Sequence, residues 1–205
     1  MNKKIVYITG CLGFIGGHLT RKCLNLGYYV RGIDKCSYAS DIKLLDEFNT
    51  YSNFVFEKID INNLKHIYDC DIFFNIAANT HVDNSISDSD DFINDNVNGV
   101  YNVLKSLMKM SYSRKIPLLC HISTDEVYAD IIEGSHKETD IVKPSSPYSA
   151  SKACADMLIL AWAKTYGIKY NIIRPTNTYG ENQRPEKLIP RTLKYLQLNK
   201  KIEIH

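Results

Sequence analysis

The sequence predicts an α/β fold in which a doubly wound parallel β-sheet carries helices on both faces. Short runs rich in β-branched and aromatic residues alternate with stretches of helical periodicity, which is typical of strands joined by helical crossovers. Several of these runs are apolar throughout, as expected of strands that helices cover on both sides. With 205 residues, 44% of them hydrophobic, the chain can bury one sizeable core.

Alternating patterns place the individual elements along the chain. The predicted strands are residues 4–9, 28–34, 54–59, 71–77, 118–123 and 170–174, and the predicted helices are residues 15–26, 92–110 and 147–166. Ser146 and Pro147 favour a helix start at this point, because proline suits the first helical turn. Neither a repeat nor a linker is evident, so no domain boundary is expected before about Asn177.

Composition limits the classes of partner. Lys and Arg total 25 against 23 Asp and Glu, a net charge of +2, so bulk electrostatics favour neither a nucleic-acid partner nor a membrane surface. A small polar ligand is expected instead. The six cysteines stand singly, without metal-ligand spacing, and predict free thiols and no metal site. Since the N-terminal apolar run ends without a cleavage pattern, we interpret it as a strand and expect a cytoplasmic protein.

A glycine-rich loop follows the first predicted strand and opens the first predicted helix. It contains Gly10, Gly13 and Gly16, with Phe14 and Ile15 between the last two. Glycines at these positions permit a tight turn and a close approach of the backbone to a pyrophosphate, and the helix N-terminus supplies free N–H groups. In this context the loop predicts a Rossmann-type dinucleotide site formed by these five residues.

Acidic residues follow the next two strands. Asp34 comes after Gly16 at close to the spacing of about 20 residues expected for the carboxylate that binds the adenosine ribose. Because a carboxylate there repels a 2′-phosphate, the cofactor is predicted to be NAD. Lys35 weakens this prediction, since a cation can accommodate the phosphate. Asp60 and Ile61 are expected beside the adenine, with a helix cap as the alternative role of Asp60.

A tyrosine and a lysine stand one helical turn apart at positions 148 and 152. At roughly 6 Å and an effective dielectric constant of about 20, the ammonium of Lys152 would stabilise the Tyr148 phenolate by about 2–3 kcal/mol, and the phenol would become a usable base. Thr124, at the end of the fifth strand, is placed to meet the same substrate oxygen. Together with the glycine loop, this arrangement resembles the short-chain dehydrogenase/reductase superfamily.

Two adjacent acids, Asp125 and Glu126, follow the fifth strand, where open α/β sheets bind ligands. Neighbouring side chains of a strand point to opposite faces, so both reach one ligand only if the chain turns out of the strand here. Oxidation or 4-epimerisation of a sugar requires only the Tyr148–Lys152 pair and NAD. An additional acid and base indicate elimination of water across two adjacent carbons.

Four segments extend the resemblance along the whole chain: residues 77–86, 123–128, 148–153 and 177–190. They are similar to the nucleoside-diphosphate-glucose 4,6-dehydratases, which are extended short-chain dehydrogenases/reductases. The resemblance implies the following course. Tyr148 takes the O4 proton while NAD⁺ takes the C4 hydride, Glu126 removes the C5 proton, Asp125 protonates the departing C6 hydroxyl, and NADH returns the hydride to C6.

The same resemblance implies the remaining binding residues. Ala77 and Ala78 are expected at the cofactor, His81 and Asn177 near the sugar or its phosphates, and Lys187 with Leu188 near the diphosphate. The alternatives are that Lys187 is only solvated and that Asn177 caps a turn. Thr124 is expected to contact the substrate. The implied substrate is UDP-glucose or dTDP-glucose, with UDP-N-acetylglucosamine as a further possibility. The sequence of residues 80–85 slightly favours a uridine nucleotide.

The long helices at residues 92–110 and 147–166 predict a homodimer with a four-helix interface, as in related enzymes, or alternatively burial within the monomer. Family members are about half as long again, so the chain is expected to lack the C-terminal third. Residues 1–176 would form the NAD-binding domain and residues 177–205 the beginning of the substrate region. Ala129 stands where the family pattern usually has glycine.

Two other functions stay open. The first is a nucleotide-sugar 4-epimerase or decarboxylase of the same superfamily, which would share Tyr148 and Lys152. The second is a non-catalytic NAD-binding module or truncated fragment, which the early C-terminus favours. The adjacent acids at positions 125 and 126 argue for the dehydratase.

Overall fold

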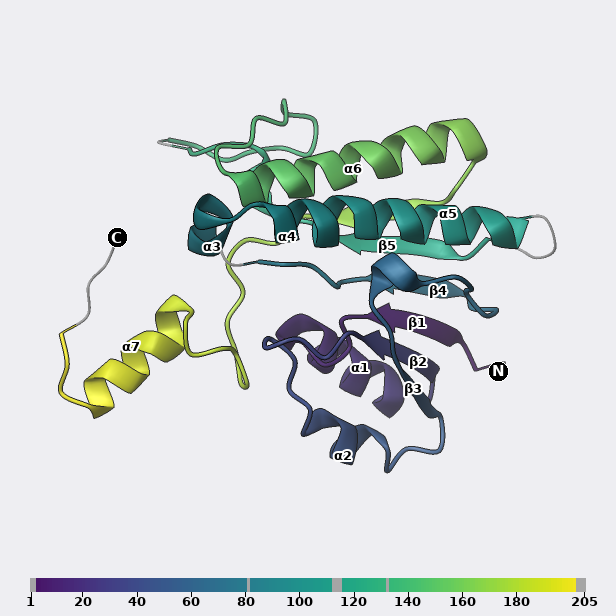
Figure 1. The fold of residues 1–205 in the computed structure, drawn as a ribbon, viewed down its shortest axis with the longest axis horizontal. Helices are drawn as coiled ribbons and strands as arrows, with labels where there is room; N and C mark the ends of the chain where they lie inside the picture. Colours follow the sequence, from purple (N-terminus) through teal and green to yellow (C-terminus); the bar gives the residue numbers. More distant parts are fainter. Residues whose placement is uncertain (1–2, 81, 112–115, 132, 202–205) are drawn as a thin grey trace.

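The sheet of this computed structural model contains six parallel strands, and the structure describes residues 3–80, 82–111, 116–131 and 133–201 (Figure 1). The strands are β1 (Ile5–Thr9), β2 (Tyr29–Asp34), β3 (Phe54–Lys58), β4 (Ile72–Asn75), β5 (Leu118–Ile122) and β6 (Tyr170–Ile173). Their spatial order is β3-β2-β1-β4-β5-β6, so the direction of winding reverses between β1 and β4. Ligands of doubly wound sheets bind at this reversal. The predicted fold class is confirmed.

Helices cover both faces of the sheet, each over its own apolar cluster. The longer helices are α1 (Phe14–Asn25), α5 (Gly99–Ser111) and α6 (Pro147–Tyr166). On β1, Tyr7 packs into the cluster that includes α5 and α6, whereas Val6 and Ile8 pack into the cluster that includes α1. All three side chains are fully buried. The alternation of strand side chains thus divides the core into two layers, and Figure 1 shows α5 and α6 running together along the sheet.

Helix α6 has the bounds that the sequence predicts. The Ser146 hydroxyl accepts from the Ser149 backbone N–H and the Ser149 hydroxyl accepts from the Ser146 N–H, so the two residues form a capping box. Gly167 ends the helix with φ +71°, a left-handed conformation that suits glycine.

Strand β4 ends earlier than the predicted residue 77, and a side chain explains why. The Thr9 hydroxyl at the end of β1 accepts from the backbone N–H groups of Ile76 and Ala77, at 2.9 and 3.0 Å. The same hydroxyl donates to Asn75 Oδ1. These bonds replace the strand ladder and fix the ends of β1 and β4 against each other.

The helix predicted at residues 92–110 is divided into three parts. Helix α4 (Asp90–Phe92) continues into a π-helix (Ile93–Asn98) and then into α5. Within the π-helix, Asn96 binds the Asn79 backbone in both directions, through N–H to Oδ1 at 2.8 Å and through Nδ2 to the carbonyl at 3.0 Å. Apolar periodicity cannot distinguish this local widening from a regular helix, and such bulges often occur at functional sites.

Several short elements and one exposed helix were not predicted. The short ones are α2 (Leu44–Phe48), α3 (Val82–Ser87) and 3₁₀ turns at Ile61–Asn63 and Asp125–Val127. Helix α7 (Leu188–Gln197) has no buried residue and lies apart from the sheet (Figure 1). No helix in the described ranges has the length and apolar character needed to cross a membrane.

Candidate functional site

A cavity of about 650 Å³ opens where the strands end, which is within the usual range of roughly 300–1,000 Å³ for ligand pockets. Every predicted site residue in the described part of the chain lines it. They are Gly10, Gly13, Phe14, Ile15, Gly16, Asp34, Lys35, Asp60, Ile61, Ala77, Ala78, Thr124, Asp125, Glu126, Tyr148, Lys152, Asn177, Lys187 and Leu188. His81 lies outside the described residues.

The glycine loop forms a cradle that tolerates no side chains at two positions. Gly10 has φ +66°, and a Cβ there would approach the Ala77 backbone to 3.0 Å. At Gly16 a Cβ would lie 1.9 Å from the Gly10 carbonyl oxygen. Helix α1 begins after Gly13 without a side-chain cap, so its first N–H groups face the loop unclaimed by a capping side chain. This geometry fits the pyrophosphate of a dinucleotide.

Asp34 is buried at the end of β2 and is fixed by three donors. Its Oδ2 accepts from the Leu12 backbone N–H at 3.1 Å, while Oδ1 accepts from the Cys36 N–H at 2.8 Å and the Ser40 hydroxyl at 2.7 Å. A carboxylate oxygen accepts about two hydrogen bonds, so Oδ2 retains capacity for a ribose hydroxyl.

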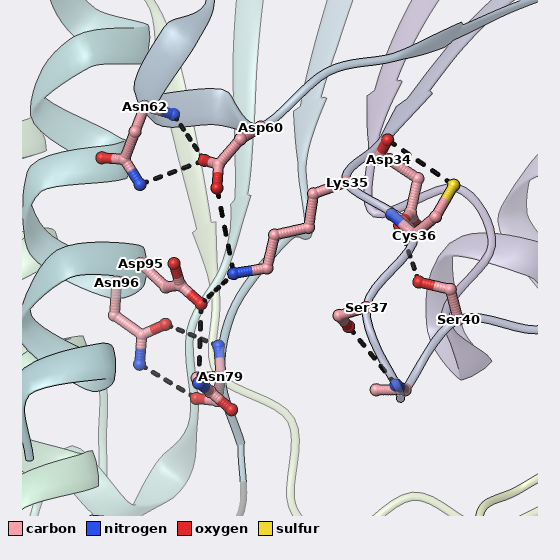
Figure 2. A network of polar contacts seen from close by, with 11 residues as sticks. Asp34, Lys35, Cys36, Ser37, Ser40, Asp60, Asn62, Asn79, Asp95 and Asn96 are labelled. Atoms are coloured by element: carbon pink, nitrogen blue, oxygen red, sulfur yellow. Dashed lines mark hydrogen bonds and ion pairs between the residues drawn. The ribbon is translucent and has the colours of Figure 1, made fainter. Parts of the chain in front are cut away.

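Lys35 and Asp60 stand on the same side of the cavity. The Lys35 ammonium lies 2.6 Å from Asp95 Oδ2 and 3.9 Å from Asp60 Oδ2 (Figure 2). Asp60 Oδ1 accepts from the backbone N–H of Asn62, so Asp60 caps the 3₁₀ turn that starts at Ile61. Asp60 therefore both caps a helical turn, which was its alternative predicted role, and lines the cavity.

Asp125 and Glu126 lie beyond the end of strand β5, so both side chains can face the same ligand. Strand β5 ends at Ile122, and the Thr124 hydroxyl accepts from the Glu126 N–H at 3.3 Å, which starts the 3₁₀ turn Asp125–Val127. Asp125 and Glu126 consequently both line the cavity. Burial and the neighbouring Asp125 raise the pKa of Glu126, while the Lys187 ammonium opposes the shift. A carboxylate with a raised pKa is a stronger proton acceptor.

The Tyr148–Lys152 pair differs from its electrostatic prediction. Burial and the Glu126 charge raise the pKa of Tyr148 to about 12, although a hydrogen bond with Thr124 opposes the rise. Burial lowers the pKa of Lys152 to about 8. The Lys152 ammonium donates to the Ile122 carbonyl at 2.7 Å. The expectation that Lys152 makes the phenol a readier base is therefore wrong for the protein alone, because both groups are desolvated and the nearby carboxylates oppose a phenolate.

A buried charged cluster that the sequence did not reveal stands behind Lys152. Arg174 donates from Nε to Asp156 Oδ2 at 2.9 Å, its Nη2 forms an ion pair with the same oxygen at 2.9 Å, and Nη1 donates to the Tyr128 hydroxyl. His121 is fully buried, with Nε2 3.5 Å from Lys152 Nζ and 3.9 Å from Asp156 Oδ1. Asp156 follows Lys152 by one helical turn, and this spacing was the available signal.

Further wall residues also escaped the sequence reasoning. They include Ser37, Tyr38, Ser40, Thr80, Asp95, Thr178, Gln183, Arg184 and Glu186. Most stand in loops without regular periodicity, whose path depends on tertiary contacts. Lys187 is not merely solvated, because its ammonium donates to the Thr80 carbonyl at 3.3 Å.

Comparisons with known proteins agree with this geometry. The NAD dependent epimerase/dehydratase family matches residues 6–205. The dTDP-glucose 4,6-dehydratase of Haemophilus influenzae is 38% identical over 98% of the chain, which covers 63% of that protein. A trifunctional UDP-glucose 4,6-dehydratase, epimerase and reductase of Arabidopsis thaliana is 36% identical over 98% of the chain, which covers 32% of that protein.

Solved structures give the same picture. The dTDP-glucose 4,6-dehydratase DesIV of Streptomyces venezuelae, with NAD bound, superposes with a TM-score of 0.86 and 33% identity over 95% of this chain and 62% of that one. The UDP-glucuronic acid 4-epimerase of Bacillus cereus, with UDP-glucuronic acid and NAD, reaches 0.87 with 28% identity over 96% of this chain and 64% of that one. The chain thus spans less than two thirds of the length of these relatives.

Proposed function

The chain belongs to the NAD-dependent epimerase/dehydratase family, and we propose that it is the cofactor-binding part of a nucleotide-sugar 4,6-dehydratase. The observation that carries this proposal is the adjacent pair Asp125 and Glu126, which leaves β5 in a 3₁₀ turn and lines the cavity together with Tyr148. A 4-epimerase needs no such acid and base.

The residues that would hold NAD stand along one wall of the cavity. The loop from Gly10 to Gly16 would receive the pyrophosphate, Asp34 the adenosine ribose, and Asp60 with Ile61 would border the adenine. Ala77, next to the loop, would border the cofactor as well. When bound, NAD supplies the acceptor for the hydride that leaves C4 of the sugar and the donor that returns it to C6.

Tyr148 would remove the proton from O4 of the sugar. Tyr148 stands in the first turn of α6, and both Tyr148 and Thr124 line the cavity. With a pKa of about 12, the phenol is a strong base once it is ionised, and positive charge at the site is what promotes that ionisation. Lys152 contributes such a charge below its pKa of about 8.

Elimination of water would then fall to the two carboxyl groups. Glu126 would take the C5 proton, in keeping with its raised pKa, and Asp125 would protonate the departing C6 hydroxyl; protonated Glu126 would then return a proton to C5 as the hydride reaches C6. Lys187, whose charge acts on Glu126, would lie near the diphosphate, with Asn177, His81 and Leu188 also at the substrate.

The substrate class and assembly complete the proposal. The substrate is a UDP- or dTDP-hexose, glucose or its 2-acetamido analogue, and the product is the 4-keto-6-deoxy sugar nucleotide. The protein acts in the cytoplasm as a homodimer through α5 and α6. Tyr101 and Met157 on these helices are more than 40% exposed, which supports an interface there. Light scattering at micromolar concentration would test the dimer, and a monomeric mass would contradict it.

Separate loss of oxidation and elimination would test the dehydratase chemistry. In the whole protein, Asp125→Asn should still oxidise C4, seen as absorbance of the reduced cofactor, but should lose about 10²–10⁴-fold in 4-keto-6-deoxy product. Glu126→Gln should suppress exchange of the C5 hydrogen with deuterated water while still permitting oxidation. Mass spectrometry of products from a panel of nucleotide sugars gives both results together with the substrate.

Unchanged product from both variants would contradict the proposal, because the carboxyl groups would then only shape the turn after β5. Inverted C4 configuration without loss of water would favour the 4-epimerase. Bound NAD with no conversion of any sugar nucleotide by the whole protein would favour a non-catalytic module.

A further inference from the structure

Lys35 is the residue of the cavity that most invites a 2′-phosphate. It follows Asp34 directly at the end of β2, on the wall where the adenosine ribose is expected. A cation at this point accommodates NADP in many dinucleotide sites. The sequence therefore leaves the preference between NAD and NADP ambiguous at this position.

The Lys35 ammonium is already engaged by a carboxylate. Its Nζ lies 2.6 Å from Asp95 Oδ2, the distance of a strong charge-assisted hydrogen bond, and 3.9 Å from Asp60 Oδ2. Figure 2 shows the lysine side chain extending from the end of β2 toward Asp95 on the neighbouring helical segment and turning its nitrogen between the two acids.

Asp95 is itself fixed in place. It stands in the π-helix Ile93–Asn98, and its side chain is 12% exposed. Asn79 Nδ2 lies 3.5 Å from the same Oδ2 atom, and the adjacent Asn96 ties this segment to the Asn79 backbone and to the Ser151 hydroxyl at 2.9 Å. The carboxylate thus belongs to an ordered polar network.

The balance of charge around Lys35 is negative. Three carboxylates, those of Asp34, Asp60 and Asp95, accompany one ammonium at this wall of the cavity. A 2′-phosphate would have to break the 2.6 Å pair and would then face an unpaired Asp95 as well as Asp34.

The other cations among the described residues of the cavity wall are also engaged. Lys187 donates to the Thr80 carbonyl and Lys152 to the Ile122 carbonyl, while Arg184 Nε lies 3.5 Å from Glu186 Oε1 in an ion pair without a hydrogen bond.

We propose that Asp95 is a specificity-determining residue for the cofactor: its ion pair withholds Lys35 from a 2′-phosphate, so that the dinucleotide with a free 2′-hydroxyl is preferred. Asp34 disfavours the phosphate directly, whereas Asp95 removes the cation that would compensate. The inference rests on the proposed cofactor site and is independent of the dehydration chemistry.

Neutralising Asp95 tests the idea. Asp95→Asn keeps the side-chain shape but frees Lys35, so the ratio of the Kd for NADP⁺ to the Kd for NAD⁺ should fall roughly tenfold, by gain of NADP⁺ affinity. Calorimetric titration of the nucleotide-free chain with each dinucleotide measures this ratio. Asp90→Asn, an exposed acid in α4, is the matched control and should leave the ratio unchanged.

Variants of Lys35 test whether the change in cofactor preference acts through this lysine. Lys35→Gln in the Asp95→Asn background should restore the original ratio, because the gain acts through the lysine. Lys35→Gln alone should lower the affinity for NADP⁺ no more than that for NAD⁺, since Asp95 already occupies the ammonium. This single variant also decides the matter if Asp95→Asn unfolds, which thermal melting would reveal.

Three outcomes would overturn the proposal, and they are distinguishable. Equal weakening of both dinucleotides in Asp95→Asn would leave Asp95 with a structural role. A selective loss of NADP⁺ affinity in Lys35→Gln would mean that the lysine is free to bind the phosphate. A parent chain that binds neither dinucleotide would refute the cofactor site itself, and the role of Asp95 with it.

Discussion

At the β2 end of the cavity, carboxylates and an ammonium pair with one another or with several donors; at the β5 end, burial shifts the pKa values of a tyrosine and a lysine. Asp34 accepts three hydrogen bonds and Lys35 pairs with Asp95 at 2.6 Å. At Tyr148 and Lys152, in contrast, burial moves the pKa values to about 12 and about 8. Satisfied charges provide selective recognition, whereas desolvated ones provide reactivity.

The buried cluster behind Lys152 explains how the β5 end tolerates this desolvation. Burial raises the pKa of Asp156, but a hydrogen bond from Arg174 Nε and the guanidinium charge oppose the shift and favour the carboxylate. His121 has its pKa lowered well below the usual value by burial and by Lys152, so it is neutral. The cluster therefore leaves one ammonium, that of Lys152, at the inner wall of the cavity.

Loss of the phenol should have the largest effect at the β5 end. Tyr148→Phe in the whole protein is expected to lower kcat by at least ~10²-fold, because a positioned base is removed, while the Kd for NAD changes little. Steady-state product formation and calorimetry measure the two quantities. Turnover within a few-fold of the parent would remove Tyr148 from the chemistry and leave the β5 end without its base.

Desolvation of Lys152 should set the alkaline limit of activity. Below its pKa of about 8 the ammonium is present, so above pH 8 kcat/KM should fall about tenfold per pH unit relative to that of Lys152→Arg, in which ionisation of Tyr148 contributes equally. The acidic limb should lie above the usual glutamate range, because the raised pKa of Glu126 keeps this base protonated to higher pH. In Lys152→Arg the guanidinium stays charged, so the alkaline limb should move upward. If the alkaline limb lies at the same pH in Lys152→Arg and in the parent, a group other than Lys152 sets it.

At the β2 end, charge and not burial should govern affinity. Asp34→Asn removes the repulsion of a 2′-phosphate, so the ratio of the Kd for NADP⁺ to the Kd for NAD⁺ should fall by a few-fold to about tenfold. Ser40→Ala is the matched control, because it removes one donor to Asp34 without changing the charge. If both variants shift the ratio of Kd values equally, the position of the carboxylate matters more than its charge.

The sequence predicted the elements and residues that depend on local chemistry, and it failed where tertiary contacts decide. Helix α6 was predicted from Ser146, Pro147 and its apolar pattern because its cap is built from neighbouring residues. The π-helix escaped prediction, since Asn96 reaches a loop 17 residues earlier in the chain. The predicted direction of the Tyr148 pKa shift was wrong because burial and the Glu126 charge, which the Tyr–Lys spacing does not reveal, raise this pKa.

The smallest expected effect concerns the loop that follows the 3₁₀ turn Asp125–Val127. Ala129 has φ +104°, a conformation that glycine adopts more readily. Such backbone strain costs about 1–3 kcal/mol, partly offset by the greater unfolded-state freedom of glycine, so Ala129→Gly should stabilise the chain by about 1 kcal/mol and raise Tm by roughly 2–4 °C. Ala161→Gly makes the same change on the exposed surface of α6 and should instead destabilise by about 0.5–1 kcal/mol. Thermal unfolding of both variants gives the sign. A loss of stability in Ala129→Gly as large as that in Ala161→Gly would mean that this loop accommodates alanine without strain.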